Sequence, residues 1–255
     1  MNFRDFRRTE IARREDLFRK QGRRPSWDES FCLRLGVPAA YLFLRTPISA
    51  PQVLLIMLVA GLLGPLLIVQ ARPGPMLAGV ACLALSALMD TADGIVFRHR
   101  GLPAVRGAYL DRFNHALIYP LTYTAFGFAA YRLTEDWRFV PVGMAAAMFR
   151  DAHETLGMYE TKFINAHSDS VRRVRASTFF RQGMYKAGEY WWVTPFFVLR
   201  NGAGTLCTHS VVFATMAVGV AAESVPQLTV YFLAVYACRF FSNAIVSFGT
   251  TFRGK

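Results

Sequence analysis

The sequence predicts an all-α membrane protein, a helical bundle of about six transmembrane helices that follows an amphipathic N-terminal helix. Hydrophobic residues make up 53% of the 255 positions, and the mean hydropathy is +0.26. They occur in long uncharged runs, such as residues 51–70. Basic residues crowd into segments 4–24 and 172–186, beside such runs. This distribution favours an anionic membrane surface and a cytoplasmic address.

The N-terminal segment, residues 1–30, is predicted to form a basic amphipathic helix and a loop. Residues 1–24 contain nine Lys/Arg and four Asp/Glu. On an ideal helix the apolar side chains fall within an arc of roughly 140°; they are Phe3, Phe6, Ile11, Leu17 and Phe18. We therefore expect a helix at the cytoplasmic membrane interface. The alternative is a solvated helix that packs on a soluble partner. Residues 22–29 predict a loop because they contain Pro25 and Trp27.

The rest of the chain, residues 31–255, is predicted to form one transmembrane domain. Residues 51–70 are enough to cross a bilayer core of about 30 Å. The next helix is expected to run from residue 76 through an acidic pair to about residue 98. Further apolar runs follow, and together they allow seven spans: residues 113–131, 139–149, 190–199, 210–222 and 225–248.

A cluster of polar residues follows the run at 139–149. It consists of Arg150, Asp151, His153 and Glu154. If the helix continues to about residue 158, these side chains lie inside or at the edge of the membrane, where ionisable groups usually face a cavity or each other. The alternative is a solvated charge cluster on a helix that projects into the cytosol.

The segment 89–115 holds the most informative pattern in the chain. Asp90 and Asp93 lie three residues apart at the end of one predicted helix, and Asp111 and His115 lie four apart at the start of the next. Side chains at these spacings share one face of a helix. Two helix ends that meet across a loop can therefore present three carboxylates and an imidazole to one divalent cation.

Residues around these ligands favour a phosphate-bearing substrate. Gly94 and Gly107 leave the backbone bare, so a ligand can come close, and Arg98 is a candidate phosphate partner. Basic residues in the connection between the two helices predict that this end faces the cytoplasm. The alternative is a structural ion network in which Arg98 and Arg112 neutralise the acids.

The pattern resembles the signature of the CDP-alcohol phosphatidyltransferases, D-x-x-D-G-x-x-A-R-x8-G-x3-D-x3-D. Six positions match, namely Asp90, Asp93, Gly94, Arg98, Gly107 and Asp111. Two positions differ. Phe97 replaces a small alanine, and His115 replaces the last aspartate, the family's metal ligand and general base.

The resemblance implies a membrane transferase of phospholipid biosynthesis that moves a phospho-alcohol group from a CDP-alcohol to an acceptor hydroxyl and releases CMP. It implies six spans, a homodimer and an active site on the cytoplasmic face of a bacterial inner membrane. CDP-diacylglycerol is among the candidate donors, and the basic segment 172–186 fits an anionic acceptor. It also implies one or two Mg²⁺ or Mn²⁺ ions, held by Asp90, Asp93, Asp111 and His115. The implied nucleotide contacts are Gly94, Arg98 and Gly107.

His115 leaves three hypotheses for the chemistry. A neutral imidazole is a competent base and a metal ligand, although it binds Mg²⁺ less well than a carboxylate does. The site could hold one firm metal with His115 and Asp111 as catalytic residues, form a mixed site that prefers Mn²⁺ or Zn²⁺, or bind nucleotide without turnover. A polytopic ion carrier and a non-catalytic scaffold are further alternatives. Despite a net charge of +12, no motif supports nucleic acid as a partner.

Overall fold

The computed structural model describes residues 2–20, 27–102, 104–166 and 209–251, and every regular element in these ranges is an α-helix. The all-α prediction is therefore confirmed for the described residues. In chain order the helices are α1 (Phe3–Lys20), α2 (Trp27–Leu44), α3 (Ala50–Ile68), α4 (Pro73–His99), α5 (Ala104–Thr134), α6 (Phe139–Ala166), α10 (His209–Ala221) and α11 (Val225–Thr251).

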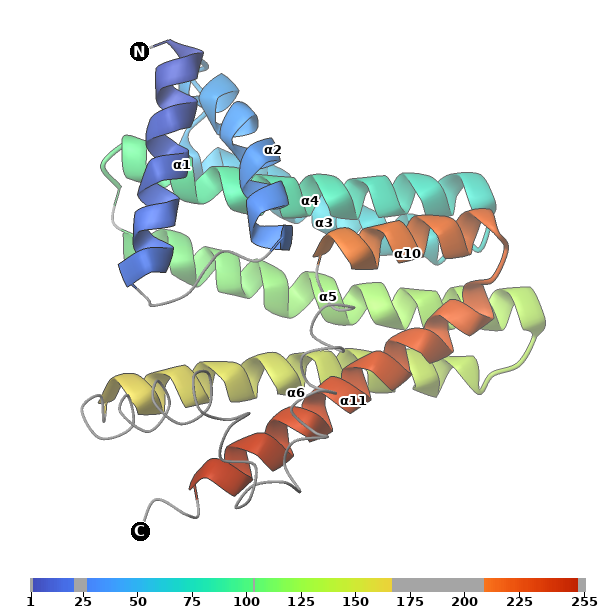
Figure 1. The fold of residues 1–255 in the computed structure, drawn as a ribbon. Helices are drawn as coiled ribbons and strands as arrows, with labels where there is room; N and C mark the ends of the chain where they lie inside the picture. The colour runs from blue at the N-terminus through green and yellow to red at the C-terminus, as the bar shows by residue number, and fades with distance from the viewer. Residues whose placement is uncertain (1, 21–26, 103, 167–208, 252–255) are drawn as a thin grey trace.

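The helices form a bundle with two further helices across one end. The axes of helices α3 to α6 and α10 lie nearly parallel, and α11 crosses them obliquely (Figure 1). Helices α1 and α2 stand steeply to the bundle at the end where α4 finishes and α5 begins (Figure 1). The predicted acidic pattern lies at this same end.

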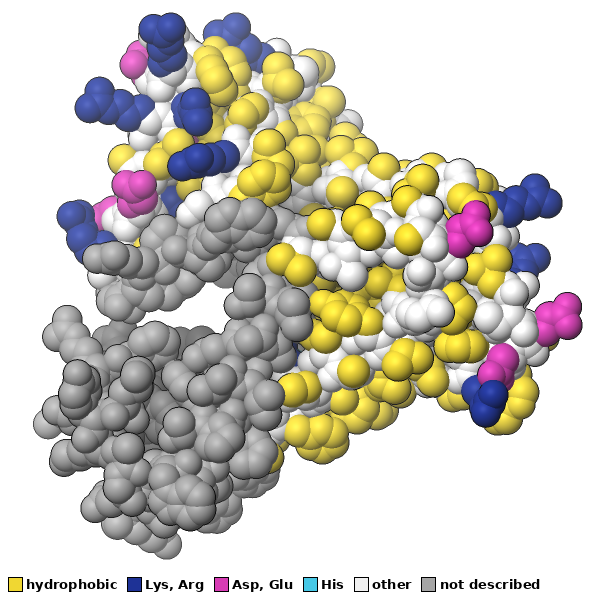
Figure 2. All heavy atoms as spheres, turned by 45° about the vertical axis from the view of Figure 1, so that its right-hand side comes forward, with side chains coloured by type: hydrophobic (Ala, Val, Ile, Leu, Met, Phe, Trp, Pro, Cys, Tyr) yellow, Lys and Arg dark blue, Asp and Glu magenta, His cyan; other side chains and the backbone are white. Residues whose placement is uncertain are grey.

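Three of the described helices are long and apolar enough to cross a membrane: Ala50–Ile68, Pro73–His99 and Val225–Ile245. Charged side chains gather over the N-terminal helices and at the far end of the bundle, and the surface between them in this view is largely apolar (Figure 2). The charged residues of the far end include Arg72, Arg132, Glu135 and Glu223, all exposed. Together these features indicate an integral membrane protein.

The first two predicted spans are observed as α3 and α4. Helix α3 starts where the Ser49 backbone N–H donates to Gln52 Oε1 at 2.6 Å, with Pro51 in the first turn, a position that suits proline. A short turn leads to α4, and there the Arg132 guanidinium of α5 donates to the Val69 carbonyl oxygen at 2.8 Å. Helix α4 runs through the acidic pair to His99, as predicted.

The end of α4 is set by a glycine. Gly101 has a φ of 66°, a left-handed conformation that favours glycine. Its N–H donates to the Arg98 carbonyl at 3.1 Å, and the Leu102 N–H donates to the Phe97 carbonyl at 3.1 Å. These are the two bonds of a Schellman motif, which ends a helix and turns the chain sharply. Helix α5 therefore begins already at Ala104, several residues earlier than the predicted third span.

The loop predicted at residues 22–29 is wrong from Trp27 onward, because α2 begins there and continues through Pro38 to Leu44. The last carbonyl groups of this region are satisfied by Arg100, whose guanidinium donates to the Phe43 and Thr46 carbonyl oxygens at 3.2 and 3.1 Å. That long-range contact is invisible in local sequence. The predicted span at 190–199 and the basic segment 172–186 lie outside the described residues.

Candidate metal centre

The depth of Asp90 follows from the pairing of α3 with α4. The Ser86 hydroxyl of α4 donates to the Met57 carbonyl of α3 at 2.9 Å. Because the two helices are antiparallel, Asp90, four residues after Ser86, lies level with about Val53. That is one turn from Ala50, where α3 begins. Asp90 therefore lies near one end of the apolar zone, close to where α1 and α2 cross.

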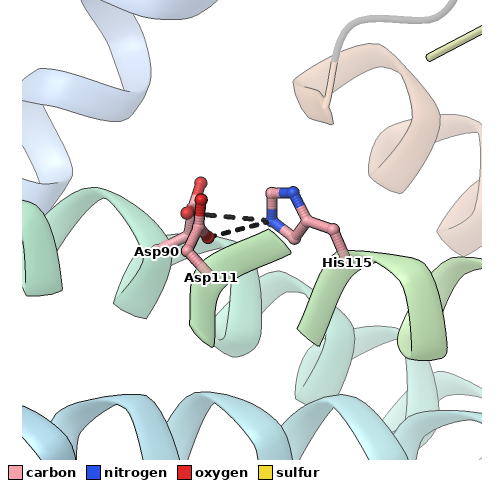
Figure 3. Close-up of side chains that lie close together, drawn as sticks. All are labelled: Asp90, Asp111 and His115. Carbon is pink, nitrogen blue, oxygen red and sulfur yellow. Dashed lines mark ion pairs between the residues drawn. The ribbon is translucent and has the colours of Figure 1, made fainter. Parts of the chain in front are cut away.

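Helix α5 brings Asp111 and His115 to the same place. They lie one turn apart, and His115 Nε2 is 3.7 Å from both Asp111 Oδ1 and Asp90 Oδ1. One ligand atom from each residue lies within 4.8 Å of the others. The two carboxylates lie beside each other on one side of the imidazole ring (Figure 3). This spacing suits three ligands of a single cation.

The surroundings of the three residues fit a cation as well. Their side chains are only 20–31% exposed. Asp111 Oδ1 is buried and has no hydrogen-bond partner among the described residues. A buried carboxylate oxygen without a donor is costly, and a bound cation removes that cost. Two carboxylates and an imidazole are ligands that Mn²⁺ or Zn²⁺ accepts more readily than Mg²⁺ does.

Asp93, the fourth predicted ligand, is not part of this group of three. It is buried, with 4% of its surface exposed, yet it interacts electrostatically with both Asp90 and Asp111. Three carboxylates thus concentrate negative charge at the meeting point of α4 and α5. A direct bond from Asp93 to a metal stays a prediction.

The structure describes the surroundings of two of the three predicted nucleotide contacts. Gly94 and Arg98 line a pocket of about 340 Å³ that Asp90 also borders. The Arg98 guanidinium donates to Glu10 Oε2 of α1 at 3.3 Å. Gly107 lies in α5, but its surroundings fall outside the described side chains.

Phe97, which replaces the family's alanine, does not line this pocket. It is buried in the apolar cluster that α1, α2, α3 and α4 share. At this position the phenylalanine ring therefore contributes to packing between helices and not to the wall of the pocket beside Asp90.

One polar residue of α6, Arg150, turns inward. The Arg150 side chain is only 13% exposed, and it pairs with Glu154 Oε2 at 2.5 Å and with Asp151 Oδ1 at 3.1 Å. Its guanidinium lies 3.7 Å from the centre of the Tyr119 ring, and the Tyr119 ring meets the edge of His115 at 5.3 Å between centroids. Tyr119 thus lies between Arg150 and His115, and Arg150 helps to hold the imidazole in position through this ring. The side chains of Asp151 and Glu154 keep 39% and 41% exposure, so of these three residues only Arg150 fits the inward-facing interpretation, and the position of the cluster relative to the membrane stays a prediction.

Sequence reasoning missed the contribution of α1. Glu10, Arg13 and Arg14 line the pocket beside Gly94 and Arg98. A signal was present, since Glu10 falls within the apolar arc of the predicted helix.

Helix α2 packs closely on α4 beside the site. Helix α2 meets α4 at Gly36, where an added Cβ would lie 2.5 Å from Thr91 Cγ2. Thr91 is the residue after Asp90, so α2 packs closely on the turn of α4 that carries the acidic motif, and Cys32 and Leu33 of α2 line the pocket that Asp90 borders. Only glycine permits such an approach.

Comparison of the chain with protein-family models gives no match, and no curated protein matches it significantly.

Proposed function

We propose that this protein is a divalent-metal-dependent membrane transferase that moves a phospho-alcohol group from a CDP-alcohol donor to an acceptor hydroxyl. One observation carries the proposal. Asp90, Asp111 and His115, which the sequence spacing places on two different helices, converge within 4.8 Å. The convergence occurs beside a pocket that also contains Gly94 and Arg98 of the same motif.

The shape and charge of the pocket support an anionic nucleotide donor. Its volume of about 340 Å³ is within the range of small-molecule sites, roughly 300–1,000 Å³. Asp90 borders it on α4, and Arg98 lies two turns further along the same helix. A diphosphate is repelled by carboxylates unless a cation lies between them, so the acids and the arginine suit one ligand only when metal is present.

Asp90, Asp111 and His115 would hold the cation, and Asp93 would add negative charge behind them. When bound, the cation neutralises the diphosphate and stabilises the departing CMP. In the reaction the acceptor oxygen forms a bond to the β-phosphorus, the bond from that phosphorus to the CMP oxygen breaks, and the acceptor loses its proton. A carboxylate oxygen of Asp111 that does not hold the cation accepts this proton, or His115 Nε2 accepts it where the carboxylates alone hold the cation. Arg98 holds phosphate oxygens.

The remaining features of the proposal concern the membrane. We propose about six spans, because α5 and α6 have 31 and 28 residues, enough to cross at 1.5 Å per residue. The metal centre would face the cytoplasm, since basic residues surround this end. CDP-diacylglycerol is a suitable donor, an anionic alcohol a suitable acceptor, and a homodimer the assembly that the resemblance implies.

The test is release of CMP by the purified protein. CDP-diacylglycerol, CDP-ethanolamine and other CDP-alcohols are incubated with it, in Mg²⁺ or in Mn²⁺, with and without candidate acceptors. We expect CMP release that EDTA abolishes and that Asp111→Asn lowers by at least about 100-fold.

Asp136→Asn is the matched control, because Asp136 lies in the turn between α5 and α6 and pairs with Arg138 at 2.7 Å. It should leave the rate unchanged. Absence of CMP with every donor, metal and acceptor would overturn the proposal and favour a carrier or a scaffold.

A further inference from the structure

The apolar face of α1 contains a buried acid. Taking about 100° per residue, Glu10 lies between Phe6 and Phe18 on the helix circumference. Its side chain is only 3% exposed, and Phe6 and Phe18 are 1% and 3% exposed. A carboxylate on a face that enters lipid is expensive. This face therefore packs on the protein, and basic side chains there pair with the Glu10 carboxylate.

Those partners lie at the end of α4. Glu10 Oε2 accepts from Arg98 at 3.3 Å, and Glu10 Oε1 lies 2.9 Å from His99 Nε2. The Phe6 ring lies 5.2 Å from the His99 ring and 5.3 Å from the ring of Tyr41 on α2. Two polar contacts and one ring contact thus hold α1 against α4, and a second ring contact holds it against α2. The position of α1 is specified by side chains from three helices.

This position carries two more arginines into the pocket. Arg13 and Arg14 line it opposite Asp90 and Gly94, and both interact electrostatically with Arg98. Three arginines therefore line one pocket, and of these Arg98 pairs with Glu10. Like charges at close range are unfavourable unless an anion lies among them. The pocket lining contains three arginines and two acids, Glu10 and Asp90, so it has a net positive charge that suits a phosphate-bearing ligand.

We infer that Arg13 and Arg14 of α1 bind the diphosphate of the ligand, with Glu10 as the residue that positions α1 for this contact. The inference rests on the proposed function and deepens it, because it makes the N-terminal helix one wall of the donor site. Arginine suits this task because its planar donors match phosphate oxygens in pairs. The cation at Asp90 would hold the opposite side of the same diphosphate.

Calorimetry of the full-length protein in neutral detergent tests the inference. Inorganic pyrophosphate and CDP are titrated separately into protein that contains Mn²⁺. The test variant is Arg13→Ala/Arg14→Ala. The matched control is Arg4→Ala/Arg8→Ala, which removes two exposed arginines from the other side of α1, roughly 120° and 160° away from Glu10.

We expect the test variant to bind pyrophosphate about 10- to 100-fold more weakly, since it loses charge-assisted hydrogen bonds. The control should change the affinity less than about twofold, and both variants should bind Mn²⁺ alone as the wild type does, which shows that they are folded. Binding to phosphatidylcholine vesicles with and without phosphatidylserine is measured in parallel. A test variant that binds pyrophosphate normally but loses binding to the anionic vesicles would overturn the inference, because the arginines would then serve lipid headgroups.

The outcomes also separate the inference from the proposed function. Wild-type protein that binds pyrophosphate but not CDP would contradict the nucleotide donor and leave the arginine site in place. Equal binding of CDP by wild type and test variant would remove the arginines from the site and leave the donor in place. Wild-type protein that binds neither ligand would overturn both.

Discussion

Replacing His115 by Asp tests whether the three side chains share one cation, because it adds a third carboxylate. His115 Nε2 lies 3.7 Å from one oxygen of Asp90 and one of Asp111. A carboxylate on the shorter Asp side chain would lie about 5 Å from each, where Coulomb's law at an effective dielectric of about 20 gives roughly 3 kcal/mol per pair.

The net loss of folding stability is smaller than the sum of the repulsion energies of the two carboxylate pairs. The side chains keep 20–31% exposure, so solvent and uptake of a proton relieve much of the repulsion. Without metal, we expect His115→Asp to be about 2 kcal/mol less stable than the uncharged His115→Asn. With saturating Mg²⁺ the order should reverse, because three carboxylates bind this hard cation better than two do.

Thermal unfolding in detergent measures the effect, with EDTA, Mg²⁺ and Mn²⁺ as three conditions. A difference of 2 kcal/mol corresponds to roughly 4–8 °C for a chain of this size. The wild type should gain more from Mn²⁺ than from Mg²⁺, and His115→Asp should gain more from Mg²⁺. If the Asp and Asn variants unfold at the same temperature in EDTA and again in Mg²⁺, the three residues do not form a common site.

Three further predictions follow from single contacts. Asp111→Asn should weaken Mn²⁺ binding by on the order of 100-fold, about 2.7 kcal/mol, as measured by titration, and unchanged affinity would exclude it as a ligand. Gly36→Leu should lower the free energy of unfolding by about 1–3 kcal/mol, since its Cβ would lie 2.5 Å from Thr91 Cγ2. Gly74→Leu is the control, because nothing lies within 4 Å of the added Cβ there. Equal thermal stability of the two variants would refute the close crossing of α2 and α4. Arg150→Met should cost about 1 kcal/mol, because its acidic partners keep 39% and 41% exposure and solvent screens much of the pairing, and a neutral effect on unfolding would show that its contacts add little.

Local sequence was sufficient for much of the fold. Uncharged runs predicted α3 and α4, and the spacing of Asp90, Asp111 and His115 predicted a meeting of two helix ends. These features are local, since hydrophobic length and helical periodicity act within a single element. The prediction from this spacing was correct because a Schellman turn at Gly101 joins α4 and α5 within a few residues, which keeps their acidic faces together.

The amino-acid sequence by itself determined the all-helical class, the apolar helices and three of the residues that converge. Only the tertiary structure decided what surrounds them. Glu10 is 88 residues from Arg98, and Gly36 is more than fifty from Thr91, so neither contact leaves a local pattern. A buried acid such as Glu10 is tolerated only if other helices place basic side chains beside it. Periodicity within one helix carries no information about those partners.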